Sequence, residues 1–245
     1  MATQTQISSS TATPPADTPT KSIAPWWHTV LVLVPLAIGS IASAYQHGLE
    51  NLHVPGLSSR FSSYVTVFLE EWFVVLLIWL ALRRRGLSIS SLVSGRWQTL
   101  GAFFRDLGLG IGFLVVEIPL ASLLSHLLGD SVSDRTASFT PQTGFELVVW
   151  LGMAATAGFC EELIFRGYLI RQFRAWTGSP VFAIVVQGVA FGLIHGYYDY
   201  KTIVVIMVEG CLLGLLAHWR KSLRPGMLAH GLEDVLGGLV GFLAR

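Results

Sequence analysis

The chain has 245 residues, of which 52% are hydrophobic and only 13% are charged, and its mean hydropathy is +0.60. Soluble domains carry about 25% charged residues, so this composition excludes a disordered chain and points away from a soluble domain. The formal net charge of +1 gives no electrostatic attraction to nucleic acid, and two cysteines, Cys160 and Cys211, are too few for a disulfide scaffold. At about 20 apolar residues per crossing, we predict an all-α polytopic transmembrane helix bundle with about seven spans.

The predicted elements begin after a segment of low complexity. Residues 1–25 are rich in Thr, Ser, Pro and Ala and carry only Asp17 and Lys21 as charges, which predicts a disordered tail. No repeat and no soluble domain follow it. The seven predicted spans are 26–44, 64–82, 107–128, 145–162, 180–198, 202–219 and 227–243.

Basic residues are divided unequally between the two sides of these spans. With the N-terminus in the cytoplasm, eleven Lys and Arg residues fall on the cytoplasmic side and four on the outer side. This excess predicts an N-in/C-out topology with a cytoplasmic tail. The cytoplasmic residues are Lys21, Arg83, Arg84, Arg85, Arg96, Arg105, Arg171, Arg174, Arg220, Lys221 and Arg224, and the outer residues are Arg60, Arg135, Lys201 and Arg245.

Several acidic residues lie within the predicted spans, where a charge costs about 2.5–3.5 kcal/mol on insertion scales. Glu70 and Glu71 lie roughly 20 Å of helix from the basic end of their span, so we interpret them as structural residues near the outer interface. Glu117 could pair with Arg166 or line a cavity, and Glu209 is interpreted in a similar way.

Three clusters differ from these isolated charges, and the first is Glu161-Glu162-Leu-Ile-Phe-Arg166. On a helix, Glu162 and Arg166 are four residues apart with the acid first, which is the favourable order for an ion pair. Glu161 points about 100° away. We therefore expect Arg166 to hold Glu162 and leave Glu161 free to act as a general base. A purely structural ion pair is the alternative.

The second cluster is Phe191-Gly-Leu-Ile-His195-Gly196, in which Phe191 and His195 share one helix face. Gly188 and Gly192 form a small-xxx-small pattern that permits close helix approach. A histidine in an apolar helix can equally be a hydrogen-bonded packing residue. A helical rise of 1.5 Å per residue places His195 within about 3 Å of the depth of Glu161, so these two side chains can face each other.

The third cluster is His230-Gly-Leu-Glu233-Asp234. His230 and Asp234 project together, and a histidine oriented by an acid is a recurring catalytic and metal-binding device. His230 follows Arg224 by only about 9 Å of helix. It can reach His195 only if helices tilt or the connection at 196–201 dips into the bilayer, and the sequence leaves this open.

These three motifs, in this order on three hydrophobic segments, resemble the CPBP family, which includes type II CAAX prenyl endopeptidases and the proteins called Abi. The resemblance covers residues 145–243 as a catalytic helix core and leaves 26–140 as accessory transmembrane helices. It implies an intramembrane protease, a hydrolase in which Glu161 and His195 activate water and His230 and Asp234 stabilise the oxyanion. Glu162 and Arg166 complete the first motif. The substrate would be a membrane protein or peptide, and nucleic acid would not be a partner.

The resemblance also implies that catalysis needs no zinc, so we expect no cofactor. If zinc were bound, His195, His230 and Glu161 would be its ligands. Asp234 replaces the Asn of the eukaryotic enzymes, and the short chain resembles the bacterial forms, which predicts the bacterial inner membrane without implying a prenylated substrate. The alternatives are a non-catalytic immunity or scaffold member of the family and an ion-coupled transporter. No inverted repeat supports the transporter.

Overall fold

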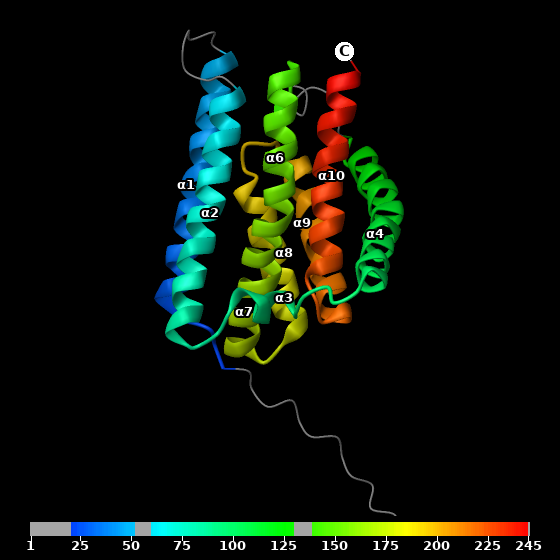
Figure 1. Cartoon of the computed structure of the whole chain (residues 1–245). Coiled ribbons are helices and arrows are strands. Elements are labelled where there is room, and N and C mark those ends of the chain that lie inside the picture. Colours follow the sequence, from blue (N-terminus) through cyan, green and yellow to red (C-terminus); the bar gives the residue numbers. More distant parts are fainter. Residues whose placement is uncertain (1–20, 52–59, 130–138, 245) are drawn as a thin grey trace, which may run out of the picture.

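The computed structural model describes residues 21–51, 60–129 and 139–244, and every regular element in these ranges is a helix. Figure 1 shows that the described chain begins at the lower end of the bundle and finishes at the upper end. Residues 1–20 of the predicted tail, together with Arg135 and Arg245, lie outside the described residues. The elements are α1 (Trp26–Asn51), α2 (Arg60–Arg84), α3 (Ile89–Val93), α4 (Leu100–Leu127), α6 (Gly144–Glu161), the π-helix η1 (Glu162–Leu169), α7 (Ile170–Thr177), α8 (Pro180–Ile194), α9 (Tyr200–Arg220) and α10 (Arg224–Leu243).

Six of the described helices are long and apolar enough to cross a membrane, counting Gly144–Thr177 as one. The remaining predicted span, 180–198, corresponds to α8, which ends at Ile194 instead of residue 198. Its 15 residues cover about 22 Å, less than the roughly 30 Å of the hydrocarbon core. The bundle is consistent with the predicted seven spans. Figure 1 places the loop between α8 and α9 below the upper ends of α6 and α10, inside the bundle.

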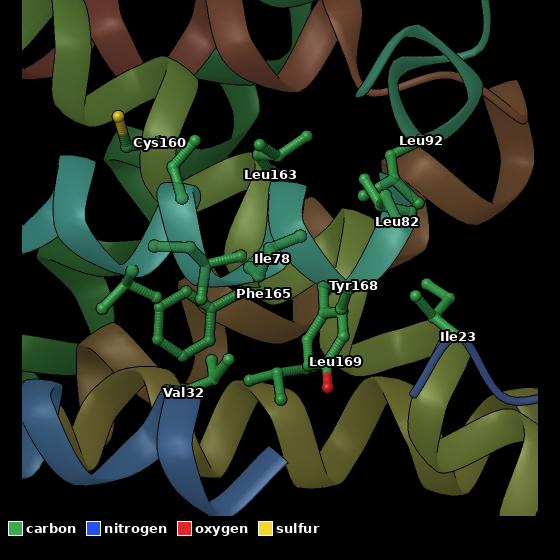
Figure 2. Close-up of a cluster of buried hydrophobic side chains, with 14 of the residues drawn as sticks. Ile23, Val32, Ile78, Leu82, Leu92, Cys160, Leu163, Phe165, Tyr168 and Leu169 are labelled. Carbon is green, nitrogen blue, oxygen red and sulfur yellow. The ribbon is translucent and has the colours of Figure 1, made fainter. Parts of the chain in front are cut away.

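The apolar core gathers around η1, all of whose residues are buried. Leu163, Phe165 and Leu169 pack against side chains of α1 and α2 (Figure 2). Ile23 and Ala24, which the sequence placed in the tail, are also buried in this core. The packed part of the chain therefore starts before Trp26.

Glycines bring neighbouring helices into backbone contact. A Cβ added at Gly158 would lie 2.6 Å from the backbone nitrogen of Gly231, and one at Gly192 would lie 2.8 Å from the backbone oxygen of Ile203. Since real Cβ atoms do not approach that closely, α6 packs on α10 and α8 packs on α9 only without side chains at these points. The close helix approach predicted from the small-xxx-small pattern of α8 is confirmed.

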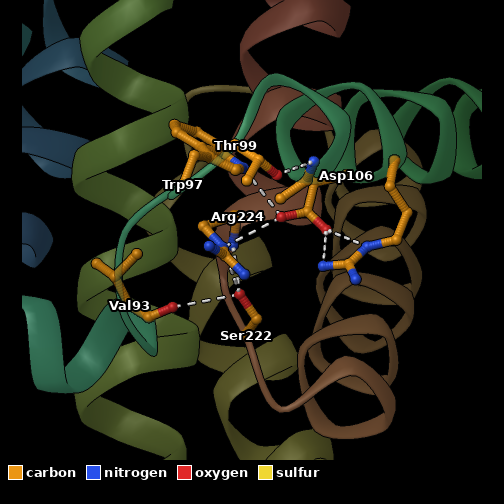
Figure 3. A network of polar contacts seen from close by, with 8 residues as sticks. Val93, Trp97, Thr99, Asp106, Ser222 and Arg224 are labelled. Atoms are coloured by element: carbon orange, nitrogen blue, oxygen red, sulfur yellow. Dashed lines mark hydrogen bonds and ion pairs between the residues drawn. The ribbon is translucent and has the colours of Figure 1, made fainter.

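A polar network joins the lower ends of α4 and α10 (Figure 3). Asp106, which is buried, accepts a hydrogen bond from Trp97 Nε1 at 3.0 Å and forms an ion pair with Arg224 Nε at 3.1 Å. Ser222 Oγ donates to the backbone oxygen of Val93 at 3.3 Å. The start of α10 is therefore fixed to the α3–α4 connection, which sets the height of His230 two turns above it.

Candidate active site

All three sequence clusters meet at one cavity of about 180 Å³ inside the bundle. Glu161, at the end of α6, and His195, just after α8, line it together, as their predicted depths require. His230 and Asp234 of α10 line it as well, so the depth mismatch expected for His230 does not keep it away. The short α8 and the recessed loop after it allow this, because His195 lies at the end of a helix that stops within the bundle.

In the first cluster one glutamate is paired with Arg166 and the other is not, as the sequence predicts. The carboxylate of Glu162 lies 2.8 Å from Arg166 NH1, and both side chains are fully buried. Glu161 is 13% exposed, and its Oε2 has no hydrogen-bond partner among the described residues. The stretch that begins at Glu162 is a π-helix, which the sequence pattern did not predict and which occurs frequently at functional sites.

The ion pair is held in place by groups on three other helices. Arg166 NH2 donates to the backbone oxygen of Gly210 at 3.3 Å, and its guanidinium lies 4.3 Å from the ring centre of Phe191. On the other side, a Cβ added at Gly226 would lie 2.8 Å from Glu162 Oε2. A side chain at position 226 would therefore require a shift of the Glu162 carboxylate or of α10.

His230 stands between three carboxylates. Its Nδ1 is 3.3 Å from Glu162 Oε1, while its Nε2 is 3.7 Å from both Glu161 Oε2 and Asp234 Oδ2. The sequence predicted Asp234 as the acid that orients this histidine. The predicted pairing of His230 with Asp234 is present as an i,i+4 ion pair. The hydrogen bond of the ring, however, is made with Glu162, which comes from a helix distant in sequence.

The hydrogen bond of His195 defines its tautomer. Its Nδ1 is 2.8 Å from the backbone oxygen of Phe191. A carbonyl oxygen only accepts, so Nδ1 carries the proton, and in the neutral ring Nε2 keeps its lone pair. His195 can therefore accept a proton at Nε2, the ring nitrogen that Phe191 does not bind.

Two cavity residues were not identified from the sequence. Glu71 is 3% exposed and lines the same cavity as Glu161, so its interpretation as an interfacial residue is wrong. Trp150 Nε1 donates to the backbone oxygen of Asp234 at 2.8 Å and so ties α10 to α6 beside the site. An acidic residue within an apolar span was the available signal for Glu71, whereas no pattern distinguished Trp150 from an interfacial tryptophan.

A second cavity, of about 50 Å³, reaches Glu161 and His195 from the side of α1 and α2. Ser40 and Glu70 are among its lining residues, and Ser40 Oγ accepts a hydrogen bond from the backbone N–H of Gly196 at 3.1 Å. Glu161 and His195 therefore line both cavities.

Zinc binds its nitrogen and oxygen ligands at about 2.0–2.2 Å, so the ligand atoms of a zinc site must lie close to one another. Within the described residues, one group of three acidic or histidine side chains brings its ligand atoms within 4.8 Å of one another, and it consists of Glu117, Glu209 and Glu233. Glu161, His195 and His230 do not form such a group. The absence of zinc from catalysis remains a prediction.

Comparison with known proteins found a family model that matches the segment containing this site. Residues 143–236 match the family model described as type II CAAX prenyl endopeptidase Rce1-like. The predicted family resemblance is confirmed. The Rce1-like segment contains all six predicted site residues: Glu161, Glu162, Arg166, His195, His230 and Asp234.

Two curated relatives each resemble about half of the chain. The uncharacterized protein YpbD of Bacillus subtilis is 28% identical over 134 residues, which cover 53% of this chain and 64% of YpbD. The UPF0177 protein YaiH of Lactococcus lactis subsp. lactis is 23% identical over 124 residues, which cover 51% of this chain and 50% of YaiH. The chain thus spans less than two thirds of either relative. No solved structure matches it significantly.

The unequal environments of the two glutamates predict unequal effects on stability. Glu162→Gln leaves the Arg166 guanidinium buried without a counter-charge, so we expect a loss of about 3–5 kcal/mol and a marked fall in melting temperature in detergent. Glu161→Gln replaces a carboxylate that has no ion pair with Arg166, and its melting temperature should stay near that of the wild type. Equal melting temperatures for the two variants would refute the different roles assigned to Glu161 and Glu162.

Proposed function

We propose that the chain is an intramembrane endopeptidase that hydrolyses a peptide bond of a membrane-associated protein or peptide. The observation that carries this proposal is the junction of Glu161, His195 and His230 at one cavity inside the helices of the Rce1-like segment. A polar cavity between helices can admit the water that hydrolysis consumes. The charges there are otherwise expensive inside a membrane, and a functional site accounts for them.

Glu161 and His195 would activate the water. The unpartnered Oε2 of Glu161 and the Nε2 lone pair of His195 are both able to accept a proton. As the water oxygen bonds to the carbonyl carbon of the substrate, its proton passes to one of these groups. The same proton is then delivered to the amide nitrogen as the C–N bond breaks, which yields a carboxylic acid and an amine. The remaining proton of the acid then passes to the amine, which leaves a carboxylate and an ammonium group.

His230 would stabilise the oxyanion. With both ring nitrogens protonated, its Nδ1–H faces Glu162, and its Nε2–H faces the cavity between Glu161 and Asp234. A donor in this position can form a hydrogen bond to the carbonyl oxygen as negative charge develops, a contribution of about 2.7–4 kcal/mol per donor in other enzymes. The ion pair of Glu162 with Arg166 would keep the ring in this orientation.

Cleavage by purified protein tests this proposal. Wild-type protein in lipid vesicles is incubated with membrane proteins from a strain that lacks it, and new N-termini are labelled and identified by mass spectrometry. We expect cleavage by the wild type and by Glu146→Gln, since Gln preserves the capping box of α6. A general base raises the reaction rate by about 100-fold or more, so Glu161→Gln should produce at least about 100-fold less product.

Three outcomes would contradict the proposal. No cleavage by a folded wild type would favour a non-catalytic scaffold member, and full activity of Glu161→Gln would remove the water-activating role. Loss of activity in 1,10-phenanthroline with recovery on adding zinc would replace the glutamate mechanism with a metal mechanism.

We also propose that the lower end of the bundle in Figure 1 faces the cytoplasm of a bacterial inner membrane. It carries the basic residues Arg83, Arg84, Arg220 and Lys221 at helix ends, which agrees with the positive-inside rule.

A reporter that is active only outside the cytoplasm tests this orientation. Fused after Arg245 it should be active, and fused after Arg85 or after Arg224 it should be silent. A silent fusion after Arg245, in a chain whose fusion after Arg85 is also silent, would place both ends of the bundle on one side and contradict seven crossings.

A further inference from the structure

Three acidic side chains from three different helices meet beside the active-site cavity. Glu117 comes from α4, Glu209 from α9 and Glu233 from α10, and their ligand oxygens lie within 4.8 Å of one another. None of the three has an ion-pair or hydrogen-bond partner in the part of the chain that the structure describes. The proposed hydrolysis uses none of them.

The most buried member of this cluster points to a missing ligand. Glu117 is only 2% exposed, and its Oε2 has no partner among the described residues. Leu114 and Leu213 form a buried apolar cluster between the same helices. A buried carboxylate in such surroundings is costly unless something compensates it, and two further carboxylates at this distance add to the repulsion.

Glu209 and Glu233 connect the cluster to a route for ions and water. Both line the 180 Å³ cavity that also contains Glu161 and His230. Glu117 stands behind them, on the α4 side. A small cation that entered the cavity would therefore meet two carboxylates at the wall and a third, fully buried one behind it.

We propose that Glu117, Glu209 and Glu233 bind one hard divalent cation of the Ca²⁺ class. All of the donors are carboxylate oxygens, which suit Ca²⁺, Mg²⁺ or Mn²⁺ better than zinc or copper. Ca²⁺ binds oxygen at about 2.3–2.6 Å in flexible geometry, so one ion can contact donor atoms that lie within 4.8 Å of one another. Mg²⁺ demands a near-ideal octahedron and is usually bound by one or two carboxylates. A site with three carboxylates therefore favours Ca²⁺, and cavity waters would complete its coordination.

The cation would hold α4 against the catalytic helices. The buried face of α4 includes Asp106, Gly110, Leu114 and Glu117. Gly110 approaches the backbone of α10 closely, since an added Cβ would lie 3.1 Å from the backbone oxygen of Pro225. Asp106 fixes the lower end of this face through Arg224, and the cation would fix it higher up. Because Glu233 precedes Asp234, the same ion would also steady the cavity wall.

Thermal stability and direct binding of Ca²⁺ test the site without any assay of cleavage. Purified protein in detergent is unfolded in EGTA and again in saturating Ca²⁺, and bound Ca²⁺ is measured by titration calorimetry. For Ca²⁺ at about 100 times its Kd, we expect the wild-type melting temperature to rise by about 5–10 °C, with about one ion bound per chain.

Two variants make the result specific. Glu117→Gln keeps the size of the side chain and removes its charge, so it should lose most of the Ca²⁺-dependent rise. Glu70→Gln removes a different carboxylate within the bundle, outside the cluster, and should keep the rise. Glu209→Gln repeats the test if Glu117→Gln does not fold.

The site is refuted if the wild type binds no Ca²⁺ and shows no rise, in which case protons hold the three carboxyl groups together. It is equally refuted if Glu117→Gln and Glu209→Gln respond to Ca²⁺ as the wild type does, or if Zn²⁺ stabilises the protein and Ca²⁺ does not. Because no readout depends on hydrolysis, these results are independent of the proposed protease activity.

Discussion

The buried ion pair between Glu162 and Arg166 is the interaction on which the rest of the site depends. It satisfies two charges that the interior of a membrane would otherwise exclude. The same Glu162 carboxylate orients His230, and the same guanidinium contacts Phe191 and Gly210. One pair thus links η1, α8, α9 and α10, while the neighbouring Glu161 is left exposed to the cavity.

The surroundings of this pair contain more acid than base. Glu71, Glu161, Glu209, Glu233 and Asp234 line the cavity, while the only basic side chains on its wall among the described residues are His195 and His230. In our account a second proton on the ring of His230 offsets part of the negative charge. In our account a hard cation at Glu117, Glu209 and Glu233 offsets another part, away from the reacting groups. Glu161 would then keep its carboxylate available for water.

Local spacing predicted much of this arrangement. The Glu162–Arg166 pair follows from an i,i+4 relationship within one helix, and the approach of α8 to α9 follows from the positions of Gly188 and Gly192. Hydropathy gave the spans but not the end of α8. The residues from His195 to Tyr198 include no Asp, Glu, Lys or Arg that would mark the end of a span, while the helix already stops at Ile194.

Contacts between distant segments were harder to predict. Counting residues along one helix gave the approximate depth of Glu71 but not the helix face that packs on α6. We expected the side chain at the membrane interface, whereas it is buried in the bundle. The same limit applies to His230. Its neighbour in sequence, Asp234, was expected to orient it and does form an ion pair with it, but the packing of α10 on α6 and η1 adds the hydrogen bond to Glu162.

The central claim is that the Glu162–Arg166 pair serves to position His230 and leaves the chemistry to Glu161. The measurement that tests it most directly compares Glu162→Gln with the double variant Glu162→Gln/Arg166→Gln for both melting temperature and cleavage. Replacing both members of a buried ion pair is often nearly neutral for stability, so the double variant should recover most of the lost melting temperature. It should remain impaired in cleavage, because Nδ1 of His230 has lost the carboxylate that orients the ring. A double variant that cleaves like the wild type, or that is no more stable than Glu162→Gln, would contradict this account.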